Sequence, residues 1–296
     1  MQHMKKMVGA VTFLLACASV VNSSISWAAG AWSWKTTLDG AASGQALKMP
    51  TALYVDGERQ RYYVVDSGGN RLLSFERDGA FLHAFSAEGK LLTPFDMVRD
   101  EADILWVVEK GRNSLTRIDV KGKSVTTNVL KDGDRTLVPD RLDYENRMFY
   151  LLDRSRGEVA VIDKDLRVNR WFECSECQGG IADFKLVKNG LWALDPIGKK
   201  VQRFSREGAA EKGFSVAAHV RFPVSIAVDQ GENVYVLDRH GASVAVFDGQ
   251  GNFKYSFLGK GWARGELYYP AEIVFDPWGR LCVTEEGNGR VGIFGR

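Results

Sequence analysis

Short apolar runs separated by polar turns recur along almost the whole chain. The run-and-turn pattern is clearest in residues 257–296, where a Gly-rich connection and a Pro precede three apolar runs. Residues 51–56, 62–66 and 71–75 repeat this arrangement, with alternating apolar and polar positions and many β-branched or aromatic side chains, which is typical of strands. Gly, Asn and Asp fill the turns between them. The pattern predicts an all-β chain, because no run is long and amphipathic enough to indicate a helix.

Three columns of residues repeat at a regular spacing. A Pro precedes the first run of five units, and Ile181 takes its place in another: Pro50, Pro94, Pro139, Pro223 and Pro270. An acid closes each second run: Asp66, Glu109, Asp153, Asp195, Asp238 and Glu285. Nine residues later an apolar residue ends each third run: Phe75, Ile118, Ile162, Phe204, Phe247 and Phe294. Successive acids are 42 to 47 residues apart, a period that predicts one four-stranded propeller blade per unit.

The six units fill the chain after an N-terminal leader. We place them at residues 49–91, 92–137, 138–179, 180–220, 221–267 and 268–296. The last unit stops after its third run, whereas residues 32–38 alternate like a strand and precede the first unit. A ring of blades exposes a sheet edge unless its last blade is completed. We therefore predict a single domain over residues 29–296, with residues 32–38 as the fourth strand of the sixth blade.

Residues 1–28 are interpreted as a signal peptide. Lys5 and Lys6 precede an apolar run, and small residues at Ser26 and Ala28 suit cleavage by signal peptidase. A membrane anchor is the first alternative, although the run falls short of the roughly 20 residues that a spanning helix needs. The second is a lipid anchor at Cys17, which follows Leu-Leu-Ala. Each alternative still implies export, so we expect a periplasmic or extracellular protein.

Charge sets limits on the partners of the exported chain. The leader holds two lysines and no acid, so the remainder has 37 basic and 37 acidic residues. A balanced domain has no general attraction to nucleic acid or to an anionic membrane. We expect the partner to be another exported protein, or a small or polymeric ligand.

The final unit resembles the NHL repeat. Gly259, Gly261, Gly265, Glu266 and Leu267 form a G-x-G-x-x-x-G-E-L pattern that ends in Pro270. The resemblance extends over residues 45–296 and is strongest in the first, fifth and sixth units. It implies a six-bladed β-propeller of the NHL type. This family includes binding modules and extracellular scaffolds, and relatives of the fold include metal-dependent lyases and lactonases, so the fold alone does not select a function.

One candidate site follows from aligning the innermost strands. Two residues after the Pro position, the units carry Ala52, Asp96, Arg141, Asp183, Ser225 and Glu272. If these positions ring the channel, carboxylates arrive from the second, fourth and sixth blades and repel one another. A hard cation such as Ca²⁺ would relieve that repulsion. Alternatively, Arg141 neutralises part of the charge and water solvates the rest.

A second candidate site lies on the face formed by the turns after the acid column. Basic and aromatic residues gather there and in the connections ahead of the Pro positions: Arg71, Arg112, Arg154, Arg156, Arg239, His240, Trp262 and Arg290. Arg and aromatic side chains are common anchors of binding interfaces. The alternative is that these cations pair with acids of their own unit and only solvate a rim.

The cysteines and one serine add little catalytic potential. Cys174 and Cys177 are predicted to form a local disulfide, with free thiols, redox chemistry and metal binding as alternatives. Cys282 lies in an apolar strand and is expected to be buried. Ser67 sits in an Asp-Ser-Gly-Gly turn that looks like a nucleophile loop, but the repeat already accounts for this turn.

Two functions remain open at this stage. Because no nucleophile and base can be paired, the sequence favours a non-catalytic, extracytoplasmic binding or scaffolding module. The alternative is a Ca²⁺- or Zn²⁺-dependent lyase or hydrolase with Asp96, Asp183 and Glu272 at the channel mouth.

Overall fold

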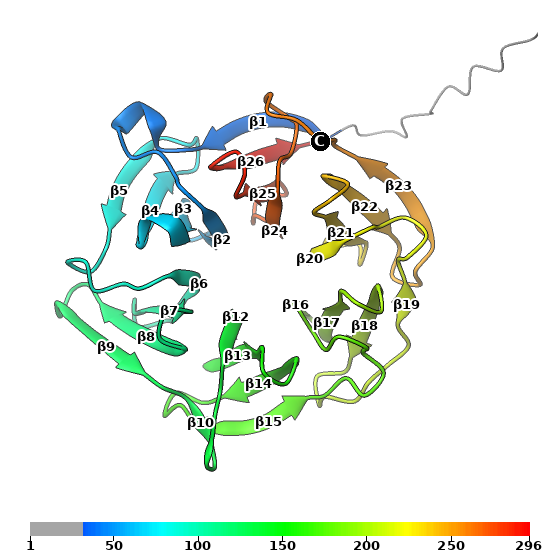
Figure 1. The fold of residues 1–296 in the computed structure, drawn as a ribbon, viewed down its shortest axis with the longest axis horizontal. Helices are drawn as coiled ribbons and strands as arrows, with labels where there is room; N and C mark the ends of the chain where they lie inside the picture. The colour runs from blue at the N-terminus through cyan, green and yellow to red at the C-terminus, as the bar shows by residue number, and fades with distance from the viewer. Residues whose placement is uncertain (1–31) are drawn as a thin grey trace, which may run out of the picture. The chain divides into compact units, whose positions relative to one another are not determined.

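A computed structural model describes residues 32–296. They form six four-stranded antiparallel sheets arranged as blades around a central axis (Figure 1). The chain is an all-β, six-bladed propeller, which confirms the predicted fold class. Every blade lies within the boundaries predicted from the repeat.

Each blade runs outward from the axis. The innermost strands are β2 (Pro50–Asp56), β6 (Pro94–Arg99), β12 (Pro139–Glu145), β16 (Asp183–Val187), β20 (Pro223–Val228) and β24 (Pro270–Phe275). The second strands are β3 (Arg61–Asp66), β7 (Leu105–Glu109), β13 (Met148–Asp153), β17 (Gly190–Asp195), β21 (Val234–Asp238) and β25 (Leu281–Glu285). The third strands are β4 (Arg71–Glu76), β8 (Ser114–Asp119), β14 (Glu158–Ile162), β18 (Lys200–Phe204), β22 (Ser243–Phe247) and β26 (Arg290–Gly295). The outermost strands are β5 (Phe81–Phe85), β9 (Ser124–Asn128), β15 (Val168–Phe172), β19 (Phe214–Ser215), β23 (Phe253–Phe257) and β1 (Ser33–Leu38). A hairpin of β10 (Lys131–Asp132) and β11 (Arg135–Thr136) and two short 3₁₀ turns, η1 (Ala41–Ser43) and η2 (Ser67–Gly69), complete the described elements.

The N-terminal strand closes the ring. β1 pairs antiparallel with β26, so the sixth sheet has the order β1-β26-β25-β24 (Figure 1). Leu38 at the end of β1 is fully buried. Trp32 stacks on Phe257 of the fifth blade, with ring centroids 5.6 Å apart. The predicted closure of the ring by the N-terminal strand is confirmed, and these contacts explain the apolar and aromatic residues that precede the first Pro.

The hydrophobic core lies between neighbouring blades. One buried cluster occupies each of the six interfaces. Each cluster receives two columns from the same blade, namely the residue four positions before the repeat acid and the residue nine positions after it. In the cluster between the sixth and first blades, for example, these are Tyr62 and Phe75. The side chains of these repeated apolar columns therefore pack each blade against the one before it.

The repeat acids fix the turns at one end of each blade. Asp195 accepts hydrogen bonds from the backbone amides of Gln178 and Gly179 in the preceding connection. It also accepts bonds from Ile197 and Gly198 in its own turn. A Cβ at Gly198 would lie 2.4 Å from the Asp195 carboxylate, so the turn requires glycine there. All six acids are buried, and their role is to join the connection to the turn.

The predicted signal peptide and Cys17 lie outside the described residues. Within residues 32–296, no helix is long and apolar enough to cross a membrane.

Candidate functional site

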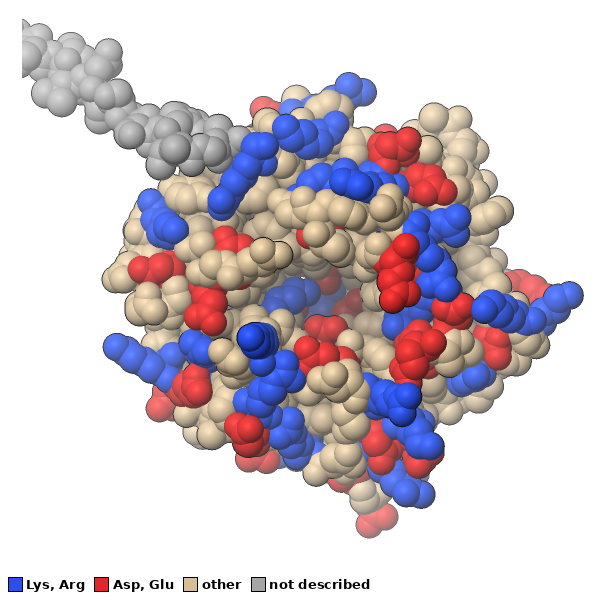
Figure 2. Space-filling view, turned by 180° about the vertical axis from the view of Figure 1, so that it is seen from behind, with Lys and Arg blue, Asp and Glu red and all other residues tan. Residues whose placement is uncertain are grey.

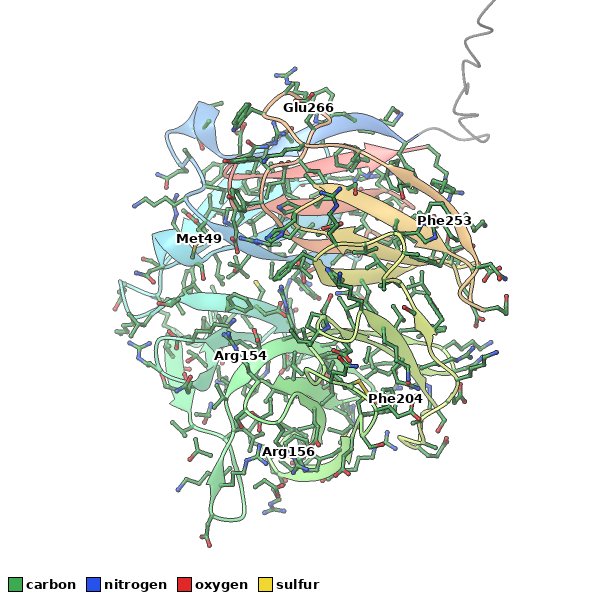
Figure 3. The ribbon with its side chains drawn as sticks, turned by 45° about the vertical axis from the view of Figure 1, so that its right-hand side comes forward. Met49, Arg154, Arg156, Phe204, Phe253 and Glu266 are labelled. Carbon is green, nitrogen blue, oxygen red and sulfur yellow. A yellow bond between two sulfur atoms is a disulfide. The ribbon has the colours of Figure 1, made fainter. Side chains whose placement is uncertain are left out.

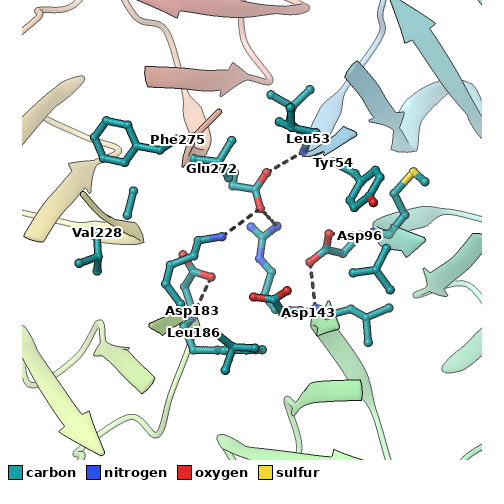
Figure 4. Close-up of a pocket in the computed structure, with 18 of the residues that line it drawn as sticks. Leu53, Tyr54, Asp96, Asp143, Asp183, Leu186, Val228, Glu272 and Phe275 are labelled. Atoms are coloured by element: carbon teal, nitrogen blue, oxygen red, sulfur yellow. Dashed lines mark hydrogen bonds and ion pairs between the residues drawn. The ribbon is translucent and has the colours of Figure 1, made fainter. Parts of the chain in front are cut away.

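The innermost strands surround a central cavity of about 270 Å³. Asp96, Asp183 and Glu272 line it together, as does Arg141 (Figure 4). Figure 2 shows the molecule hollowed at its centre, with basic and acidic side chains visible inside. The channel positions lie beside an irregularity in the strand register, as at Pro94 and Asp96. The structure thus brings together the three acids that the sequence aligned.

Each of the three carboxylates binds the backbone of the following blade. Asp96 accepts a hydrogen bond from the amide of Leu142 at 3.0 Å. Asp183 accepts one from Ile226 at 2.9 Å, and Glu272 accepts one from Leu53 at 2.7 Å. The three acceptors occupy one repeat position in alternate blades, and the three donors occupy the next position in the blades between them. The acids therefore connect the second blade to the third, the fourth to the fifth, and the sixth to the first.

Two cations compensate this acidic ring. The Arg141 guanidinium lies 3.5 Å from Glu272 Oε1 and also donates to the carbonyl of Thr51. Lys185 Nζ lies 4.0 Å from the same Glu272 oxygen (Figure 4). Arg141 is buried, whereas the Lys185 side chain keeps 24% of its exposure. The channel therefore holds both acids and cations rather than three acids alone.

Burial and charge shift the protonation of these groups. Burial, reinforced by the Glu272 carboxylate, raises the pKa of Asp96 to about 7. Burial also raises the pKa of Glu272, although Lys185 and Arg141 oppose this shift. For Lys185, burial lowers the pKa, but the carboxylates of Asp183 and Glu272 outweigh it and raise the pKa overall. A carboxyl that exchanges a proton near neutral pH beside two fixed cations can act as an acid and as a base.

The channel acids already have protein partners where the sequence predicts a bound cation. Within residues 32–296, no group of three or more His, Cys, Asp or Glu side chains is placed to hold a metal ion. One oxygen of each channel acid already accepts a backbone amide from the next blade. Arg141 and Lys185 supply the positive charge that a divalent ion would otherwise bring to these acids. The bound Ca²⁺ stays a prediction, and the chemistry of the ring favours the alternative in which Arg141 supplies the charge.

The alignment of the sequence missed two charged residues of the cavity. Asp143 and Lys185 line it beside the predicted acids. Each lies two residues after a channel position, Arg141 or Asp183, on the same strand. Because strand side chains alternate with period two, a second inward layer could have been read from the sequence. Burial raises the pKa of Asp143, although Lys185 lowers it.

A second cavity of about 360 Å³ meets the channel on the side of the repeat-acid turns. Arg141 lines both cavities, so its side chain lies at their boundary. Lys110 lines the second cavity and pairs with Asp140 at 2.7 Å. Arg154 lines it too, whereas Arg156 of the same turn pairs with Glu158 (Figure 3). The second cavity therefore extends from the repeat-acid face to Arg141, where it meets the channel.

Most cations of the predicted binding face are held by their own blades. Arg71 contacts Asp66 at 2.8 Å, and Arg112 contacts Glu109 at 2.6 Å. Arg290 pairs with Glu285 at 2.8 Å and donates to three backbone carbonyls. These contacts match the alternative in which the cations stabilise their own turns. A side chain already committed to an internal carboxylate has less to offer a partner.

One accessible part of that face lies on the fifth and sixth blades. Arg239 and His240, with Tyr268 and Tyr269, line a cavity of about 140 Å³. His240 stacks on Phe222 with ring centroids 4.5 Å apart. Trp262 is 71% exposed, and its ring centroid lies 5.3 Å from that of Tyr268. Arg239 itself pairs with Glu286.

The cysteines behave as structural residues. Cys174 and Cys177 form the predicted disulfide in the connection between the third and fourth blades. Cys282 is a buried free thiol, and burial raises its pKa well above the ordinary value. Ser67 is buried and donates its hydroxyl to the carbonyl of Pro94 in the second blade. This bond joins two blades and explains the serine without catalysis.

Comparison with known proteins supports the fold and does not identify a family for the chain. No protein-family model and no curated protein sequence matches the chain. A virginiamycin B lyase from Staphylococcus aureus, solved as an inactive variant with quinupristin, is 13% identical with a TM-score of 0.62, over 83% of this chain and 80% of that one. A streptogramin B lyase is 12% identical with a TM-score of 0.63, over 90% and 97%. A gluconolactonase from Xanthomonas campestris is 17% identical with a TM-score of 0.64, over 84% and 86%.

These similarities establish a six-bladed propeller of the architecture shared by the lyases and the gluconolactonase. They do not specifically show the NHL-repeat family, which remains a resemblance of motifs. All three neighbours are enzymes, so the non-catalytic scaffold favoured by the sequence finds no support among them.

Proposed function

We propose that the protein is an extracytoplasmic hydrolase or lyase that cleaves a C–O bond of a small cyclic ester in its central channel. One observation carries the proposal: the carboxyl of Asp96, with a pKa raised to about 7, lines a 270 Å³ cavity together with Arg141 and Lys185. The neighbours that are named a lyase and a gluconolactonase support an enzymatic function. The Cys174–Cys177 disulfide supports a compartment outside the reducing cytoplasm.

We assign the proton transfers of the reaction to Asp96. For hydrolysis, ionised Asp96 accepts a proton from the attacking water as the water oxygen bonds to the ester carbonyl carbon. The ester C–O bond then breaks, and Asp96 returns the proton to the departing alkoxide oxygen. For elimination, Asp96 instead removes a proton from the carbon adjacent to the breaking C–O bond, a C=C bond forms between the two carbons, and the ester oxygen departs as a carboxylate. Such a group contributes about 10²–10⁴-fold to the rate.

The neighbouring cations would stabilise the charge that develops. Lys185 keeps part of its side chain exposed, and the carboxylates around it hold it protonated. Its ammonium can therefore donate to a carbonyl oxygen as that oxygen becomes negative. Arg141 is buried against Glu272 and the Thr51 carbonyl, so it fixes the ring rather than contacting substrate.

Turnover of a defined panel tests this function. Purified protein, treated with EDTA and then freed of the chelator, is assayed against γ- and δ-lactones and against quinupristin. The proposal predicts that at least one compound is turned over after chelation, because every step is assigned to a side chain. Trp262→Ala serves as a matched control, since it removes an exposed aromatic side chain outside the channel.

Two outcomes would overturn the proposal. Loss of all turnover after chelation, with recovery on adding Ca²⁺ or Zn²⁺, would replace the acid–base scheme with a metal-dependent one. If turnover is unchanged in the Lys185→Met variant, the reaction does not take place in the channel.

A further inference from the structure

The interface between the first and second blades differs from the other five in the two repeat columns that one blade inserts into it. In each interface, one blade contributes the residues four before and nine after its repeat acid. Across the six described blades these pairs are Tyr62 and Phe75, Leu105 and Ile118, Phe149 and Ile162, Leu191 and Phe204, Val234 and Phe247, and Leu281 and Phe294. Every pair except Leu105 and Ile118 includes an aromatic ring. In these two columns the second blade is therefore the one that places no aromatic ring against its neighbour.

A cavity of about 390 Å³ lies at this interface and shares no lining residue with the channel cavity. Its apolar lining comes from both blades and includes Tyr63, Leu72, Ala84, Phe85 and Leu105. Val120, at the turn after β8, also lines it and is 54% exposed. Exposed apolar surface at the edge of a cavity is a common feature of ligand sites. The missing ring thus coincides with a cavity that is open to solvent.

Cationic groups surround this apolar space. Arg61, Arg99 and Lys121 line it, with Asp103 as the acid among them. Asp103 is shared by three cations, because it pairs with Arg59 and Arg99 as well as with Lys121. Arg61 has only a 3.6 Å contact with Glu76, and its side chain is 41% exposed. Arg99 is also paired with Asp56 at 2.7 Å, so Arg61 is the most weakly paired of the three cations that line the cavity.

Two donors at the cavity are left without acceptors. The Nε atoms of Arg61 and Arg99 are buried and make no hydrogen bond among the described residues. A buried N–H without a partner is costly. Because neither Nε atom is exposed, a ligand's acceptor would meet the outer guanidinium N–H groups of Arg61, whose side chain is 41% exposed. A sulfonate or carboxylate is the chemical group that suits an arginine N–H.

We propose that this cavity, between the first and second blades, binds a small amphipathic anion with an aromatic or alicyclic body and one anionic group. The apolar body occupies the space that an aromatic ring fills at the other interfaces. The anionic group lies at the rim against Arg61 and Arg99. This site is separate from the channel and does not depend on the function proposed for it.

A matched pair of fluorescent probes tests the site. 1-Anilinonaphthalene-8-sulfonate carries a sulfonate, and N-phenyl-1-naphthylamine has the same rings without it. We expect saturable binding of the sulfonate at one site, and binding of the uncharged probe that is weaker by about fivefold or more, in line with a partly exposed charge contact. The preference should shrink as salt is added, because the rim charges are partly exposed.

Two variants locate the binding. Leu105→Phe introduces the ring found at the corresponding Phe149 of the third blade, and it should weaken sulfonate binding by at least about tenfold by filling the cavity. Because the ring enters existing space, the melting temperature should be unchanged or higher, which separates this effect from misfolding. Arg61→Gln should remove most of the preference for the charged probe while leaving the uncharged probe bound.

The control is Trp262→Ala, which removes an exposed aromatic side chain on the face of the repeat-acid turns, outside this cavity, and should leave probe binding unchanged. The proposal is overturned if neither probe binds saturably. It is also overturned if folded Leu105→Phe binds the sulfonate as the wild type does, or if the uncharged probe binds equally well.

Discussion

Replacing Arg141 by Met tests the charge balance of the channel. The Arg141 side chain is 8% exposed and that of Glu272 is 5% exposed, with 3.5 Å between Nη1 and Oε1. Removing one partner of such a buried pair leaves an uncompensated charge and costs about 3–5 kcal/mol. The carbonyl of Thr51 also loses a donor. The loss is a large part of the roughly 5–15 kcal/mol that stabilises a typical domain.

A double-mutant cycle in urea isolates the pair. With an m value of about 3 kcal/mol/M, Arg141→Met should lower the unfolding midpoint by about 1 M or more. Glu272→Gln alone should cost less, because Arg141 still faces Asp96 and Asp183. The double variant should be more stable than the sum of the single losses predicts, by about 0.5–3 kcal/mol. Additive losses, or a cost below about 1 kcal/mol for Arg141→Met, would refute the view that Arg141 balances the ring.

Three further predictions follow from the fold and the site. Because the folded pKa of Asp96 is about 7, above the unfolded value, its contribution to stability is present below about pH 4 and is lost as pH rises through about 7. Between pH 4 and pH 7, urea titrations should show the free energy of unfolding of the wild type falling by about 3 kcal/mol more than that of Asp96→Asn; an equal decline in both proteins would contradict the assignment. Leu38→Ala, at the fully buried end of β1, should cost about 2–5 kcal/mol in the same assay, whereas a cost near zero would mean that β1 does not close the ring. In a chain that begins at residue 29, Cys282 should react with a thiol reagent only on unfolding, because burial raises its pKa and covers the sulfur; fast labelling of the native protein would disprove this.

The sequence was most informative where a residue repeats in every unit. The Pro, acid and apolar columns each have one structural task, so their periodicity predicted the blades and the strand at residues 32–38. The same alignment placed Asp96, Asp183 and Glu272 in one cavity, because equivalent positions of radial blades meet at the axis.

What the sequence did not predict depends on side-chain reach and local pairing. Arg71 and Arg290 carry the charge expected of a binding face, but each contacts an acid five residues away on its own hairpin. Lys185 lies at the inward position two residues after Asp183, which the alignment did not include, and its long side chain brings its ammonium to Glu272 in the sixth blade. The cavity between the first two blades is an intermediate case. Leu105 and Ile118 already break the aromatic pattern in the sequence, but only the packing shows that no other side chain fills the gap.

The most direct test of the channel as a reaction site is the rate of Asp96→Asn on a compound that the wild type turns over. If Asp96 transfers the proton, kcat should fall by about 10²–10⁴-fold while KM changes little, because the amide keeps the shape of the side chain but cannot exchange a proton. Undiminished kcat in the folded variant would contradict the account and place the chemistry elsewhere in the molecule.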